Sequence, residues 1–161
     1  MKWSTLFYLK IFAIVISLLT PWICWYIEGP MKALSSYWYS DTWLLFLLTN
    51  TITAYYFLTL PGWRISAFFL ISLTVFPCED YVILHDVLAI LFFILNAKPI
   101  TQNKRLYGYF IPYVLSFSVL LFSLFWAEVL AITVLCLYHG HSLVLLKRLK
   151  IKQEKIFSYN K

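Results

Sequence analysis

Long apolar runs, separated by short breaks that contain proline, glycine or charged residues, fill most of the chain. The first four runs cover residues 6–27, 42–60, 62–77 and 81–98. A helix needs about 20 apolar residues to cross a bilayer, and somewhat fewer when its ends are anchored at the interfaces. Each run therefore predicts one membrane-spanning helix, of which the third is short and crosses with little tilt.

The last apolar run extends from residue 107 to residue 146 and has one acid, Glu128, at its centre. This length is about twice that of one span. The run therefore predicts a hairpin that turns near residues 126–128, with spans over 107–125 and 127–146. The expected fold class is all-α, a polytopic integral membrane bundle of six helices. Residues 1–146 form its single transmembrane domain and residues 147–161 a basic tail.

Composition supports lipid as the solvent of this chain. Of its 161 residues, 62% are hydrophobic and 12% are charged, whereas soluble domains average about half apolar and about a quarter charged. A globule of this size leaves much of its surface in water and cannot hide that excess. The apolar run after Lys2 resembles a signal peptide, but no small-residue cleavage site follows it, so we expect a retained first helix.

Basic and acidic residues sort to opposite sides of the six-span arrangement. Lys32 alone of the 13 lysines and arginines falls on the side opposite the chain ends, and Glu154 alone of the seven acids falls on the side of the chain ends. Lysine and arginine bias loops toward the cytoplasm. The sequence therefore predicts cytoplasmic termini, and the opposite side is called the outer face.

The first outer loop, residues 28–41, is rich in tyrosine and tryptophan. These residues are typical of the interfacial belt of membrane proteins. Residues 31–39 could form a short helix that lies on the surface.

Acidic residues and one histidine gather on the outer face around the start of the fourth span. Charge is expensive next to lipid, so such a cluster belongs at a membrane surface or in a protein-lined cavity. We expect the cluster to bind a lipid headgroup, a cation or a protein partner. Its members are Glu79, Asp80, His85, Asp86 and Glu128. The alternative is that the outer loops are simply solvated and acidic, with Glu79 or Asp80 capping the fourth helix.

Glu128 admits two interpretations of its own. At the outer interface it could cap the sixth helix, where a carboxylate at the N-terminus is favoured. If it is buried in the bundle it needs a partner, and His85 is the nearest by depth.

A divalent cation at His85, Asp86 and Glu128 is a further hypothesis, since carboxylates and imidazole are its common ligands. The chain contains no HExxH spacing and no GxSxG nucleophile signature. The middle of every predicted span is neutral, unlike the charged or broken midplane helices typical of transporters.

Other histidines and the cysteines have structural interpretations. His139 and His141 are two positions apart on a helix and point to different sides, so one should face the bundle and the other the inner interface. A polar helix contact beside Gly140 is the expected role. Cys24 and Cys78 fall toward the same membrane face, which makes a disulfide possible in an oxidising compartment.

The basic tail indicates a second kind of contact. Lys147, Arg148, Lys150 and Lys152 follow the last apolar run directly and could dock on anionic lipid of the inner leaflet. The formal charge of +6 would suggest nucleic acid in a soluble protein. Here no basic face or recognition motif accompanies it, so we expect no nucleic-acid partner.

Two short patches resemble a known family. Residues 85–93, His-Asp-Val-Leu-Ala-Ile-Leu-Phe-Phe, open the fourth span, and residues 126–128, Trp-Ala-Glu, open the sixth. The chain resembles the DRAM/Frag/Sfk group of six-helix membrane proteins and their bacterial relatives of unknown function. His85, Ala89 and Glu128 match that pattern, while the first outer loop lacks the family's acidic signature. The resemblance implies six spans, cytoplasmic termini and a role in lipid-linked membrane organisation or lipid remodelling.

The leading hypothesis is a non-catalytic membrane protein whose outer acidic and histidine residues bind a lipid headgroup, a cation or a partner. One alternative is a membrane-embedded, metal-dependent lipid hydrolase or remodelling enzyme. Another is an accessory subunit of a larger membrane complex, which predicts a co-purifying membrane-protein partner.

Overall fold

The structure is a computed structural model that describes residues 3–159, with side chains described for residues 4–149. The described part of the chain is helical and contains no strand. It comprises six α-helices and four short 3-10 helices. The α-helices are α1 (Trp3–Glu28), α2 (Trp43–Leu58), α3 (Arg64–Val75), α4 (Val82–Gln102), α5 (Phe110–Ser116) and α6 (Leu124–Tyr159). The 3-10 helices are η1 (Leu34–Tyr39), η2 (Pro61–Trp63), η3 (Tyr107–Tyr109) and η4 (Phe117–Leu121).

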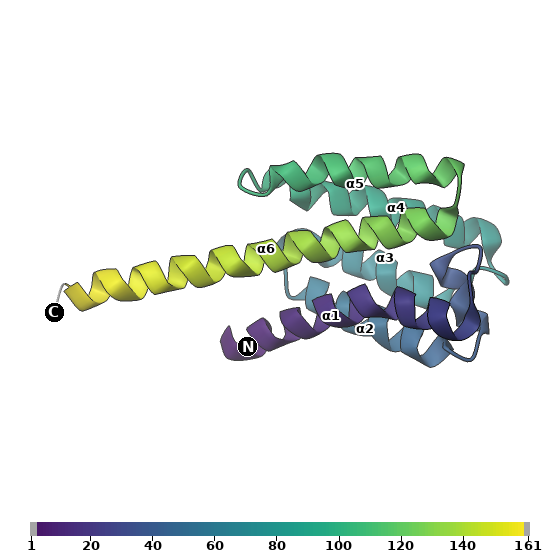
Figure 1. Cartoon of the computed structure of the whole chain (residues 1–161), viewed down its shortest axis with the longest axis horizontal. Helices are drawn as coiled ribbons and strands as arrows, with labels where there is room; N and C mark the ends of the chain where they lie inside the picture. Colours follow the sequence, from purple (N-terminus) through teal and green to yellow (C-terminus); the bar gives the residue numbers. More distant parts are fainter. Residues whose placement is uncertain (1–2, 160–161) are drawn as a thin grey trace.

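Consecutive helices run in alternating directions (Figure 1), and the contacts between them close into a ring. Each helix from α1 to α5 contacts the next, and α6 contacts both α5 and α1. The last part of α6 projects beyond the bundle on the side where the chain begins. The prediction of an all-α bundle is confirmed.

Three helical segments are long and apolar enough to cross a membrane, namely Ser4–Glu28, Val82–Gln102 and Leu124–Leu149. They coincide with the first, fourth and sixth predicted spans. Three shorter apolar helical segments, Trp43–Leu58, Pro61–Val75 and Tyr107–Leu121, occupy the other predicted spans. The chain therefore has the helices of a membrane protein.

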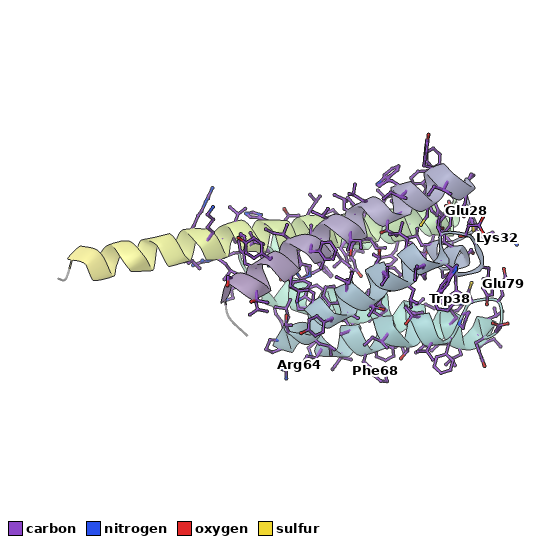
Figure 2. The ribbon with its side chains drawn as sticks, turned by 90° about the horizontal axis from the view of Figure 1, so that it is seen from below. Glu28, Lys32, Trp38, Arg64, Phe68 and Glu79 are labelled. Carbon is purple, nitrogen blue, oxygen red and sulfur yellow. The ribbon has the colours of Figure 1, made fainter. Side chains whose placement is uncertain are left out.

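Large apolar side chains cover the outside of the bundle. Phe68 is 63% exposed, Ile83 82% and Ile94 62%, and Figure 2 shows Phe68 at the outer edge of α3. Monomeric soluble proteins rarely expose contiguous apolar surface on this scale. The exterior is therefore suited to lipid rather than to water.

Four of the α-helices contribute a buried alanine to the apolar interior of the bundle. Ala13, Ala54, Ala67 and Ala131 belong to α1, α2, α3 and α6, and all are buried in one apolar cluster. Small residues let helix backbones approach closely where lipid provides no hydrophobic drive for association.

The turn before α6 lies earlier than residues 126–128, where the sequence analysis placed it. The Ser123 hydroxyl accepts a hydrogen bond from the Trp126 amide at 3.4 Å, as an N-cap serine does. Because the cap is at Ser123, Glu128 falls in the second turn of α6 rather than in the loop.

The loop after α1 packs against the bundle instead of lying on its surface. Gly29 ends α1 with a φ of 79°, in the left-handed region that favours glycine. Tyr37 of η1 is fully buried, and its hydroxyl donates a hydrogen bond to the Gly29 carbonyl at 2.7 Å. The expected short helix is present as η1, and it covers the end of the bundle.

Charged side chains of the described chain separate to the two ends of the bundle, except that Lys32 lies with the acids (Figure 2). Figure 2 shows Glu28 and Glu79 at the end where α1 and α3 finish, and Arg64 at the end where α3 begins. We call the first the acidic end and the second the basic end. The acidic end also carries Asp41, Asp80, Asp86 and Glu128, and the basic end Lys10, Lys98, Lys104 and Arg105.

Candidate functional site

A cavity of about 640 Å³ lies between α4, α5, η4 and α6. Its polar lining is concentrated at the acidic end, and the rest of its wall is aliphatic and aromatic. We call it the groove. Ligand pockets for small molecules commonly measure about 300–1,000 Å³ and are mostly apolar with a few polar groups. The polar residues of the lining are Ser35, His85, Asp86 and Glu128.

His85 is buried, with 5% of its surface exposed, and it is held in one orientation. Its Nδ1 lies 2.7 Å from the carbonyl oxygen of Phe76, the residue that follows the last turn of α3. A carbonyl oxygen only accepts hydrogen bonds, so Nδ1 carries the proton. Nε2 is then the ring nitrogen left for a ligand in the groove.

Glu128 binds the backbone of η1. Its Oε2 accepts a hydrogen bond from the Leu34 amide at 2.7 Å, and the Phe125 amide donates to the Lys32 carbonyl at 3.2 Å. Glu128 has the partner that the second interpretation requires, but that partner is the Leu34 amide and not His85. The carboxylate caps η1 instead of α6, and no hydrogen bond joins it to His85 among the described residues.

Asp86 and the two acids before α4 have different surroundings. Asp86 is exposed and lines the groove. Glu79 and Asp80 lie in the exposed loop, where their amides donate to the Tyr39 hydroxyl at 3.2 and 3.3 Å and that hydroxyl donates to Asp80 Oδ2 at 3.1 Å. The structure thus brings His85, Asp86 and Glu128 to one cavity and leaves Glu79 and Asp80 outside it.

Neither Glu79 nor Asp80 caps α4. The N-cap position of α4 is Tyr81, and no side chain bonds the free amides there. The capping alternative is therefore wrong for both residues.

The apolar wall of the groove was not identified from the sequence. Ala89, Phe93 and Ala97 follow His85 at intervals of four residues, and all line the groove. Residues four apart share a helix face. This spacing is the signal that could have revealed the wall, but Tyr113 of α5, whose hydroxyl donates to the Phe93 carbonyl at 2.8 Å, has no such signal.

A metal centre has no support in the geometry of the described residues. They contain no group of three or more His, Cys, Asp or Glu side chains that could hold a metal ion. His85, Asp86 and Glu128 share the groove without forming one. Within the described residues Cys24, Cys78 and Cys136 are all free thiols, so the hypothetical disulfide is not formed.

The remaining predicted residues lie along α6. His139 is buried and His141 exposed, which confirms that they face different surroundings. A Cβ on Gly140 would meet nothing within 4 Å, so the helix contact does not depend on that glycine. Lys147 and Arg148 are exposed, while the side chains of Lys150 and Lys152 lie outside the described ones.

Comparison of the chain with protein-family models, with curated proteins and with solved structures finds no match. The resemblance to the DRAM/Frag/Sfk group therefore stays a prediction. What the site can do follows from its own chemistry. It offers an apolar slot with two carboxylates, a serine hydroxyl and one imidazole nitrogen at a single end.

Proposed function

We propose that this protein crosses the membrane six times with both chain ends in the cytoplasm, and that its groove binds one membrane lipid. The headgroup would lie at the acidic end, beside His85, Asp86 and Glu128. One acyl chain would lie along the apolar wall.

The amphipathic form of the groove is the observation that carries this proposal. The stretch of α4 that lines it runs from His85 to Ala97, which is about 18 Å at 1.5 Å per residue. The hydrocarbon core of a bilayer is about 30 Å thick. The groove thus matches the depth of one leaflet, which fits an acyl chain better than a helix from a partner protein.

Access from the bilayer also supports a lipid. Ile90, Ile94, Val114 and Leu120 line the groove, and each is exposed at the outside of the bundle. The apolar wall is therefore continuous with the surface suited to lipid, and a chain could enter sideways without crossing a polar layer.

The charges at the mouth favour a headgroup that carries an amine. Asp86 and Glu128 contribute two carboxylates, and no lysine or arginine lines the groove among the described residues. An anionic headgroup would meet like charge here, whereas an ammonium group would gain a counter-ion. We therefore infer preference for an aminolipid such as phosphatidylethanolamine over phosphatidylglycerol.

Photo-crosslinking tests the groove directly. Full-length protein in bilayers would be irradiated with phosphatidylethanolamine that carries a diazirine on one acyl chain, and cross-linked peptides would be mapped by mass spectrometry. We expect the adducts to concentrate on the facing stretches of α4, α5 and η4.

A matched pair of variants makes this test specific. Ala89→Phe adds a ring inside the groove, whereas Val87→Phe adds the same ring on an exposed position of α4 that does not line it. Cross-linking should fall several-fold in the first variant and stay unchanged in the second. Equal yields in both, or adducts spread evenly over all helices, would contradict the proposal.

A further inference from the structure

A second cavity, of about 550 Å³, opens at the basic end of the bundle. It lies between α1, the turn that contains η2, the last turn of α4 with the loop after it, and α6. We call it the basic pocket. It is separate from the groove, since the two cavities share no lining residue.

Three cations and no acid line the basic pocket among the described residues. The cations are Lys10 of α1 and Lys104 and Arg105 of the loop after α4. Among the side chains that the structure describes, the acids lie at the other end of the bundle. The pocket therefore has a positive potential that no neighbouring carboxylate neutralises.

The surroundings of Lys10 are the first indication that the pocket binds an anion. It is 8% exposed, and its Nζ donates a hydrogen bond to the Ser142 hydroxyl. That hydroxyl in turn donates to the His139 carbonyl at 2.9 Å. A buried ammonium ion is costly unless it is paired, and the only partner that Lys10 has in the described structure is neutral.

His139 is the second sign, and it is independent of the first. It is 4% exposed, and its Nδ1 lies 3.1 Å from the Tyr56 hydroxyl. Its Nε2 is buried and has no hydrogen-bond partner in the described structure. His139 lines both the basic pocket and a smaller cavity inside the bundle. Buried polar atoms almost always have a partner, and a phosphate that reaches this ring would supply the missing one.

Aromatic rings and the loop after α4 make the pocket a built site. The His139 ring lies 4.5 Å from that of Trp63 and 5.2 Å from that of Tyr138, centroid to centroid. Asn103 Oδ1 accepts a hydrogen bond from the Arg105 amide at 3.2 Å, which shapes the loop that carries Arg105. The backbone of the loop that carries Arg105 is therefore fixed beside the cavity, and the His139 ring is packed between aromatic neighbours, before any ligand binds.

We propose that the basic pocket binds a phosphate group. A phosphate offers several acceptor oxygens to an arginine fork, to lysine ammonium groups and to a ring N–H at once. The basic end of a membrane bundle also lies at the depth of lipid phosphates. The same chemistry would recognise the phosphate of an anionic phospholipid or that of a soluble phosphorylated molecule.

Two probes distinguish these sources in the full-length, delipidated protein. Equilibrium dialysis with radiolabelled inorganic phosphate measures a soluble ligand, and native mass spectrometry with phosphatidic acid, against phosphatidylcholine as reference, measures a lipid. We expect saturable binding of at least one phosphate probe. Binding of phosphatidic acid alone would assign the site to a lipid headgroup, and binding of inorganic phosphate would extend it to soluble ligands.

Substitutions locate the site. Arg105→Gln and Lys10→Met should each weaken binding about tenfold or more, the usual effect of losing a hydrogen bond to a charged group. Lys98→Gln is the matched control, since Lys98 is exposed at the same end and does not line the pocket. Arg105 is exposed, so its substitution keeps the test valid even if Lys10→Met fails to fold.

The proposal is overturned if neither probe binds saturably to the unaltered protein. It is also overturned if Lys98→Gln loses as much affinity as Arg105→Gln, because binding would then follow total charge and not the pocket.

Discussion

The Glu128 side chain contacts the backbone of η1 and also lines the groove. Its Oε2 holds the first amide of η1, and the same residue lines the groove. A ligand at the mouth of the groove would therefore contact a carboxylate that also fixes the loop after α1. The role of Glu128 in holding the Leu34 amide can be tested without any ligand.

Glu128→Leu should lower the free energy of unfolding by about 1–3 kcal/mol, because the Leu34 amide loses its acceptor in a buried place. Glu128→Gln keeps an acceptor oxygen and should cost less. Thermal melting with hydrogen exchange at the Leu34 amide measures both. Glu79→Leu is the control, since the Glu79 side chain is exposed and has no hydrogen bond of its own in the described structure. An equal loss of stability there would argue against a specific role of Glu128 in holding the Leu34 amide.

At the residue scale the sequence predicts which polar groups matter better than it predicts their partners. An acid or histidine beside apolar runs is visible from composition, so His85, Asp86 and Glu128 were identified. The Leu34 amide and the Phe76 carbonyl were not, because backbone atoms carry no sequence signal. Lys10 and His139 come together from residues far apart in the chain, and only the fold determines that proximity.

Among the elements, η1 and the loop before α4 depend on one another through Tyr39. The Tyr39 hydroxyl accepts hydrogen bonds from two backbone amides and donates one to the Asp80 carboxylate. The loop that leads to His85 is therefore fixed from the neighbouring segment as well as by the hydrogen bond between His85 and the Phe76 carbonyl.

Tyr39→Phe removes these three hydrogen bonds. Because they are exposed, we expect a local effect of about 0.5–1.5 kcal/mol, typical of a net hydrogen bond, and little change in global stability. Hydrogen exchange at the Glu79 and Asp80 amides should accelerate several-fold. Tyr26→Phe, at a side chain 86% exposed, should leave the exchange rates of these amides unchanged. Unaltered exchange in Tyr39→Phe would show that the Tyr39 hydrogen bonds do not fix this loop.

Element boundaries were predicted well where composition changes and poorly where geometry decides. The apolar run predicts an end of the fourth helix near Lys98, yet α4 continues to Gln102. Pro99 lies in its last turns, where a proline costs one hydrogen bond without stopping the chain. α6 begins earlier than predicted, because the Ser123 cap is a local signal inside an apolar run, where hydropathy shows no boundary.

At the scale of the whole molecule, two features favour the same transverse orientation in a membrane. Consecutive helices alternate in direction, and the acidic and basic ends lie at opposite ends of the bundle. Helical class and membrane character follow from the lengths of the apolar runs, since lipid admits helices and closed barrels alone. The closed ring, the groove and the basic pocket do not follow, because helix order around a bundle depends on side-chain packing that hydropathy does not encode.

Single-cysteine labelling tests the proposed topology in a background without the native cysteines. In intact cells an impermeant maleimide should react with a cysteine at Glu79 or Lys32, and should reach Lys98, Lys104 and Lys147 only after the membrane is opened. Labelling of positions 98 and 147 from different sides would be incompatible with six spans.

α6 has one mechanical consequence. It is a single helix of 36 residues, about 54 Å long at 1.5 Å per residue, and its distal part stands clear of the other helices (Figure 1). The same rod carries Glu128 near one end and His139 midway. A protein that binds the projecting part of α6 and tilts it would therefore move the linings of the groove and the basic pocket together.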